Sequence, residues 1–159
     1  MNKPIEIPKT FTPLQIVAMA LALLLTVGSG VYLMICWPHL PQSLPSHYNF
    51  AGQPDAWSGK SNLLFLYAIN FLTVGSMLVV SFFPKIWNVP VMVNEQNATK
   101  VYHHTRTLLC NCTLIIAVIF TWLQVYSMLA KPLGPWFLPL TLITLFGQMA
   151  YSLIFIYKK

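Results

Sequence analysis

Apolar and polar residues alternate along this chain in long blocks, which divide it into four apolar stretches and the polar connections between them. The stretches cover residues 14–37, 63–83, 108–129 and 136–157. A helix needs about 20 residues to cross the apolar core of a bilayer, and each stretch reaches that length. The pattern predicts an all-α integral membrane protein. We expect one domain over residues 1–159, an antiparallel four-helix transmembrane bundle.

Residues at the ends of the stretches support these boundaries. Thr12, Pro13 and Gln15 form the pattern of a helix start, with a capping hydroxyl, a proline in the first turn and a glutamine that can close a capping box. Pro84 is expected to end the second helix, and Pro135 precedes the fourth. The last two helices are therefore predicted to be neighbours joined by a short connection.

The composition excludes a soluble enzyme domain, because only 8% of the 159 residues are charged and 57% are hydrophobic. An ordinary soluble domain is about 25% charged. The three cysteines, Cys36, Cys110 and Cys112, lie in or beside apolar stretches and predict buried thiols rather than a disulfide framework. The net charge of +6 comes from residues scattered at the ends of stretches. It predicts a lipid bilayer as the partner and no nucleic acid.

The basic residues also predict the orientation in the cell membrane. If both termini are cytoplasmic, the inner side carries seven basic residues: Lys3, Lys9, Lys85, Lys100, Arg106, Lys158 and Lys159. The outer side then carries only Lys60 and Lys131, which satisfies the positive-inside rule. The basic start and Gly28-Ser29-Gly30 resemble a signal peptide with its cleavage site, but apolar residues continue to Trp37. We therefore expect a retained first span.

The two longer connections are expected to be ordered. The outer loop, residues 38–61, lies between the first two helices and contains four prolines, which predict a stiff, extended backbone. His47 and Asn49 should share one face of it, and residues 52–55 should form a turn. Asp55 is the only acid on the outer side and is expected to offset Lys60. In the inner loop, residues 85–104, Asn94 is predicted to cap a helix that continues into the third span.

The outer loop contains a specific run of residues, Leu40-Pro41-x-x-Leu44-Pro45-x-His47-Tyr48-Asn49-x-x-Gly52-x-Pro54-Asp55-x-Trp57-x-x-Lys60. This run resembles the signature of a bacterial and archaeal membrane family, the domain of unknown function numbered sixteen forty-eight. That domain also forms the N-terminal part of SdpI-type immunity proteins, which protect a cell from a secreted toxin and can signal its presence. The resemblance implies a prokaryotic, SdpI-like immunity or sensing protein, and it supplies no catalytic residues.

Six residues are candidates for a ligand-binding site on the outer side: His47, Asn49, Asp55, Lys60, Asn70 and Gln124. The first four would form a polar site on the outer loop, or a structural cap in which they bond to one another and to the backbone. Asn70 and Gln124 lie within the spans beneath the loop, where they could line a pocket or join helices through amide hydrogen bonds. His39, His47 and Asp55 are weak candidates for a metal site, since their spacing fits no known signature. No cofactor is predicted.

Three functions remain open from the sequence. The chain could bind or sense an external peptide or small-molecule ligand through the outer loop, which is the hypothesis that the resemblance favours. It could be a small membrane enzyme with its site beneath the loop, although no paired carboxylates or activated nucleophile point to catalysis. It could also be an accessory subunit that packs against a membrane protein partner or forms a homo-oligomer.

Overall fold

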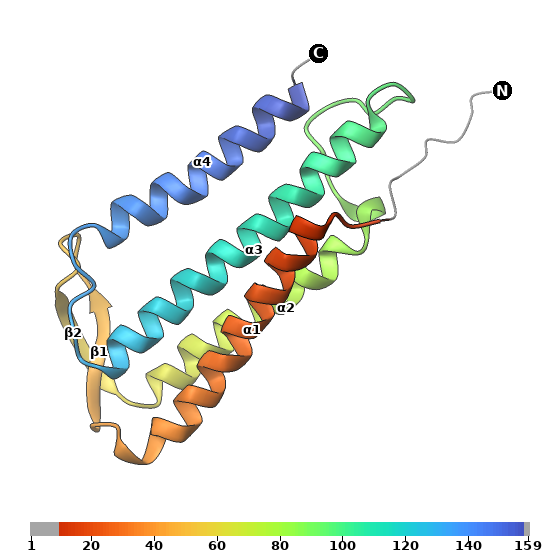
Figure 1. Ribbon diagram of the computed structural model, residues 1–159. Coiled ribbons are helices and arrows are strands. Elements are labelled where there is room, and N and C mark those ends of the chain that lie inside the picture. Colours follow the sequence, from red (N-terminus) through yellow and green to blue (C-terminus); the bar gives the residue numbers. More distant parts are fainter. Residues whose placement is uncertain (1–9, 158–159) are drawn as a thin grey trace.

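Four long helices dominate the computed structural model, which describes residues 10–157 (Figure 1). They are α1 (Pro13–Cys36), α2 (Asn62–Ser81), α3 (Ala98–Met128) and α4 (Phe137–Tyr157). Each is long and apolar enough to cross a membrane, which confirms the four predicted stretches. The remaining described elements are two strands and two single turns of 3-10 helix, Trp37–His39 and Pro84–Ile86. Lys3, Lys9, Lys158 and Lys159 lie outside the described residues.

The ends of the helices agree in part with the sequence patterns. The capping box of α1 is confirmed: the Thr12 hydroxyl accepts from the Gln15 backbone N–H, and the Gln15 side chain accepts from the Thr12 N–H. The helix expected to begin within the inner loop, residues 85–104, and to continue into the third span is present, since α3 begins at Ala98. Asn94 does not cap this helix but accepts from the backbone N–H groups of Gln96 and Asn97, which closes a turn before it.

The outer connection is a β-hairpin, which the sequence analysis did not predict. Strand β1 (Ser43–Tyr48) pairs antiparallel with β2 (Pro54–Gly59), with Ser43 opposite Gly59 and irregularities in the register around His47. Both strands contain a proline, which is tolerated because each strand of a two-stranded ribbon has a free edge. The turn occupies residues 49–53, so the turn expected at 52–55 is displaced by about three residues.

Helix α3 is the centre of the packing. It packs against α1, α2 and α4, whereas α4 packs along α3 alone among the helices of the described chain (Figure 1). Ala22 of α1 and Ala117 of α3 are fully buried and meet Val74 of α2, and these small side chains let the helices approach closely. Figure 1 shows the hairpin at one end of the bundle and both ends of the described chain at the other.

Candidate functional site

The hairpin is fastened to the helix ends beneath it. The Ser127 hydroxyl, near the end of α3, donates a buried hydrogen bond of 2.6 Å to the Pro45 carbonyl of β1. The Leu133 N–H, in the connection between α3 and α4, donates to the Gly52 carbonyl at 2.8 Å. Leu44 of β1 is buried in an apolar cluster with Leu63 and other core residues. These contacts hold the hairpin as a fixed cover over the bundle.

A cavity of about 520 Å³ lies beneath this cover, bounded by the hairpin and by the ends of three helices. Its volume falls within the range of small-molecule sites, roughly 300–1,000 Å³. The lining residues are Pro45, Ser46, His47, Tyr48, Asn49, Phe50, Gly52 and Asp55 from the hairpin, with Asn62, Leu66, Leu123, Ser127, Leu133, Phe137 and Leu138 from the helices and the α3–α4 connection. The polar groups are concentrated on the hairpin, and the helix walls are mainly apolar.

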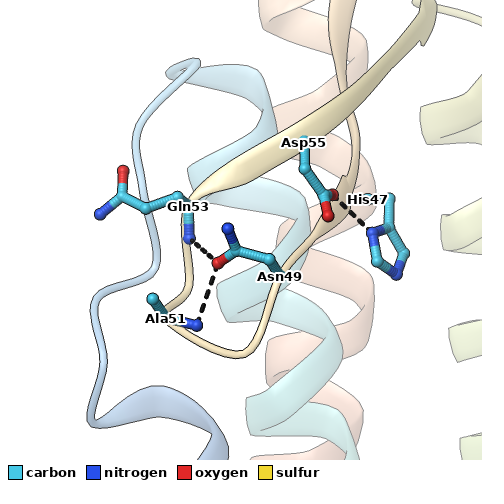
Figure 2. A network of polar contacts seen from close by, with 5 residues as sticks. All are labelled: His47, Asn49, Ala51, Gln53 and Asp55. Atoms are coloured by element: carbon cyan, nitrogen blue, oxygen red, sulfur yellow. Dashed lines mark hydrogen bonds and ion pairs between the residues drawn. The ribbon is translucent and has the colours of Figure 1, made fainter.

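His47 and Asp55 form a hydrogen-bonded pair across the hairpin, which is an ion pair when the imidazole is protonated. The His47 Nδ1 and an Asp55 carboxylate oxygen are 2.5 Å apart, and the two side chains come from opposite strands of the hairpin (Figure 2). Their side chains are 68% and 42% exposed, so solvent screens the pair and its contribution to stability is small. In residues 10–157, the Nε2 of His47 and the other carboxylate oxygen of Asp55 have no hydrogen-bond partner. Both atoms are available to a ligand in the cavity.

Asn49 organises the turn between the strands. Its side-chain oxygen accepts from the backbone N–H groups of Ala51 at 2.9 Å and Gln53 at 3.0 Å, as Figure 2 shows. Its backbone N–H donates to the Gln53 carbonyl, and its carbonyl accepts from the Gly52 N–H. Asn49 therefore acts as a structural residue at the tip of the hairpin.

Asn49→Ala is expected to lower the free energy of unfolding by about 1 kcal/mol, because two backbone N–H groups lose their acceptor at an exposed position. Asn49→Asp keeps the acceptor and should unfold like the wild type. The measurement is thermal unfolding of the purified protein in mild detergent. Equal losses in both variants would show that the two side-chain hydrogen bonds do not stabilise the turn.

Lys60 is not paired with Asp55, contrary to the expectation from the sequence. Its ammonium group donates to the Trp37 carbonyl at 3.3 Å and lies 4.9 Å from the centre of the Trp37 ring. The four residues between Asp55 and Lys60 all belong to β2, and a strand advances about 3.3 Å per residue. The two charges are therefore held near opposite ends of β2. Lys60 instead ties the start of α2 to the end of α1.

Asn70 and Gln124 are buried inside the bundle, and neither lines the cavity. The Gln124 amide donates to the Ser29 carbonyl of α1 at 2.8 Å, which joins α3 to α1. The Asn70 amide has no hydrogen-bond partner in the described part of the chain. His39 does not join His47 and Asp55, since no three His, Cys, Asp or Glu side chains in residues 10–157 are grouped closely enough to hold a metal ion.

Residues missed by the sequence analysis form most of the cavity wall. Leu66, Leu123, Phe137 and Leu138 belong to apolar stretches in which they cannot be told from lipid-facing residues by their spacing. Tyr48 entered the sequence analysis only as one position of the run from Leu40 to Lys60. Its hydroxyl oxygen is buried without a hydrogen-bond partner among the described residues, and burial raises the pKa of this phenol. Tyr48 therefore remains a neutral potential donor at the cavity.

Comparison with known proteins identifies one family. The model of the family described as "Domain of unknown function (DUF1648)" matches residues 24–71, which comprise the second half of α1, the hairpin and the first half of α2. This match confirms the resemblance found in the outer loop. No curated protein and no solved structure matches the chain. The matched segment contributes the hairpin and α2 residues of the cavity lining, and α3, α4 and their connection contribute the rest.

Proposed function

We propose that this chain, whose residues 24–71 belong to the DUF1648 family, is a prokaryotic cell-membrane protein that binds an external ligand beneath its hairpin. The observation that carries the proposal is the 520 Å³ cavity with His47 and Asp55 at its polar side. Binding there would let the protein sense a small molecule or peptide outside the cell, as SdpI-like immunity proteins do with a toxin. Because loops held by a rigid scaffold often carry function, the hairpin is the natural recognition element.

The proposed topology places the hairpin outside the cell, with antiparallel spans and both termini in the cytoplasm. In support, Lys60 lies at the hairpin end, and Lys131 follows α3 at the same end. Lys85, Lys100 and Arg106 lie near the opposite end, where the positive-inside rule expects them. The hydrogen bond between Asn111 of α3 and Gln148 of α4 is compatible with helices that run in opposite directions.

His47→Ala and Asp55→Asn are each expected to unfold within about 0.5 kcal/mol of the wild type, because an exposed, screened pair adds little stability. Both should lose binding. A thermal-shift screen of amino acids, short peptides and phospholipids in mild detergent measures this, since a ligand at 100 times its Kd stabilises the folded state by about 2.7 kcal/mol.

Lys131→Ala is the matched control, an outer basic residue that does not line the cavity. It should keep the full shift of every compound that stabilises the wild type. The proposal fails if the compounds that stabilise the wild type stabilise His47→Ala and Asp55→Asn equally. It also fails if these two variants are themselves strongly destabilised, because the pair would then serve the fold.

The His47–Asp55 pair also supports a second candidate function, a membrane hydrolase. A carboxylate at Nδ1 orients the imidazole of a catalytic histidine and leaves Nε2 to take a proton. Ser127 is not an evident nucleophile, because its hydroxyl already donates to the Pro45 carbonyl. An activated water would be required instead. Hydrolysis of a p-nitrophenyl ester that is lost in His47→Gln would favour this function over simple binding.

A further inference from the structure

The cavity extends from the polar hairpin into the apolar part of the bundle. Asn62 lies in the first turn of α2, and Leu66 lies one turn further along, about 6 Å deeper at 1.5 Å per residue. Leu123 lies five residues before the end of α3, at a similar depth. The cavity therefore has a polar rim at the hairpin and an apolar interior below it. This order matches that of a phospholipid, whose acyl chains lie below its headgroup.

The side of the cavity between α2 and α4 is not closed by packing of these two helices. Leu66 of α2 and Leu138 of α4 both line the cavity, but in residues 10–157 these helices do not pack along each other. Figure 1 shows α4 lying along α3, away from α1. Phe50, at the tip of the hairpin, lines the cavity and is 88% exposed. A ligand that resides in the bilayer can therefore reach the cavity from the side.

The charged and polar groups at the rim of the cavity determine which lipid headgroup could bind there. Asp55 is the one acidic side chain of the outer connections, and its second carboxylate oxygen is unoccupied in the described chain. When the imidazole is protonated at both nitrogens, the Nε2–H of His47, on the side of the ring away from Asp55, can donate to a phosphate oxygen. Lys60 is held by Trp37, and Lys131 does not line the cavity. The rim therefore offers an acceptor for an ammonium group at Asp55 and a donor for a phosphate at the neighbouring His47.

We propose that the cavity binds one phospholipid with a zwitterionic, amine-bearing headgroup from the outer leaflet, its ammonium at Asp55, its phosphate at His47 and the start of an acyl chain against Leu66, Leu123 and Leu138. This inference rests on the proposed binding function and names its ligand class. An anionic lipid without an amine has no group to pair with Asp55, and its negative charge is repelled by the Asp55 carboxylate.

Native mass spectrometry of the full chain, with phosphatidylethanolamine and phosphatidylglycerol of identical acyl chains, tests the proposal. The wild type should retain one phosphatidylethanolamine with about tenfold preference, a difference of about 1.4 kcal/mol. Asp55→Asn keeps an acceptor for His47 but removes the charge, and it should reduce the preference to about twofold or less. Leu138→Trp fills the apolar end and should reduce occupancy about tenfold.

Leu140→Trp is the matched control, since Leu140 lies on the same helix, is 57% exposed and does not line the cavity. It should bind like the wild type. Equal retention of both lipids by the wild type, or equal occupancy in Leu138→Trp and Leu140→Trp, would overturn the proposal. If Leu138→Trp does not fold, the headgroup preference of the exposed Asp55→Asn variant decides alone.

Soluble phosphoethanolamine separates this inference from the broader binding function. It carries the headgroup without acyl chains and should bind far more weakly than the lipid. If it, or a peptide from the thermal-shift screen, binds in an Asp55-dependent way while the lipid does not, the phospholipid proposal is wrong and the binding function stands. If neither lipid nor soluble compound depends on Asp55 or His47, both are wrong.

Discussion

Gly52→Ala is expected to lower the free energy of unfolding by about 2–5 kcal/mol, for two reasons that add. Gly52 has a φ of +71°, which costs a residue with a side chain about 1–2 kcal/mol. A Cβ atom at this position would also lie 2.3 Å from the carbonyl oxygen of Gly134. Because the obstacle is backbone, the hairpin tip must move away from the α3–α4 connection, and overpacking of this kind costs about 1–3 kcal/mol.

Substitutions of two other glycines distinguish the conformational cost from the steric cost. Gly134 also has a positive φ, +86°, but a Cβ atom there meets nothing within 4 Å, so Gly134→Ala should show the conformational cost alone. Gly59, at the end of β2, has neither feature, and Gly59→Ala should be nearly neutral. Thermal unfolding in mild detergent gives the order of the three. Equal losses for Gly52→Ala and Gly59→Ala would mean that the tip is not packed against the connection.

Gly52→Ala should also weaken ligand binding, because the Gly52 carbonyl accepts from the Leu133 N–H and so holds one wall of the cavity. The loss of binding would accompany the loss of stability. This distinguishes Gly52 from His47 and Asp55, whose replacement is expected to affect binding alone.

Arg106→Ala is expected to destabilise the opposite end of the bundle by about 2–4 kcal/mol. The Arg106 side chain is only 2% exposed, and it donates to the Thr10 carbonyl at 2.9 Å. Its guanidinium carbon lies 4.6 Å from the centre of the Phe11 ring and 5.6 Å from that of Trp87. A charge-assisted hydrogen bond contributes about 1.5–3 kcal/mol, and each cation–π contact about 0.5–2 kcal/mol when desolvated. One residue of α3 thus joins the start of α1 to the segment that follows α2.

Arg106→Lys and Lys85→Ala serve as controls for the same thermal unfolding measurement. Lysine keeps the charge but not the planar group that stacks between two rings, so Arg106→Lys should lose an intermediate amount. Lys85 is an exposed basic residue at the same end, and Lys85→Ala should change stability by less than about 0.5 kcal/mol. If Arg106→Ala unfolds like Lys85→Ala, the buried guanidinium does not hold these segments together.

Local patterns predicted the features that depend on neighbouring residues. The start of α1 was predicted because a capping box needs only Thr12 and Gln15, three residues apart. The turn of the hairpin was predicted about three residues too late in the chain. Its position depends on the pairing between the two strands, which a local pattern does not contain. The partner of Lys60 was also wrongly predicted. Asp55 is close to Lys60 in sequence, but the extended strand holds it at the other end of β2.

By itself, the sequence determined that four apolar segments are long enough to span a membrane and that a polar, proline-rich segment with a family signature connects the first two. These properties follow from hydropathy, which acts residue by residue, and from motifs with fixed spacing. Only the tertiary structure decided that His47 and Asp55 meet, that Asn70 and Gln124 lie outside the cavity, and that Leu66, Leu123 and Leu138 line it. In an apolar helix, lipid-facing and cavity-facing leucines have the same chemistry. The difference between them arises when the hairpin and the helix ends are packed together.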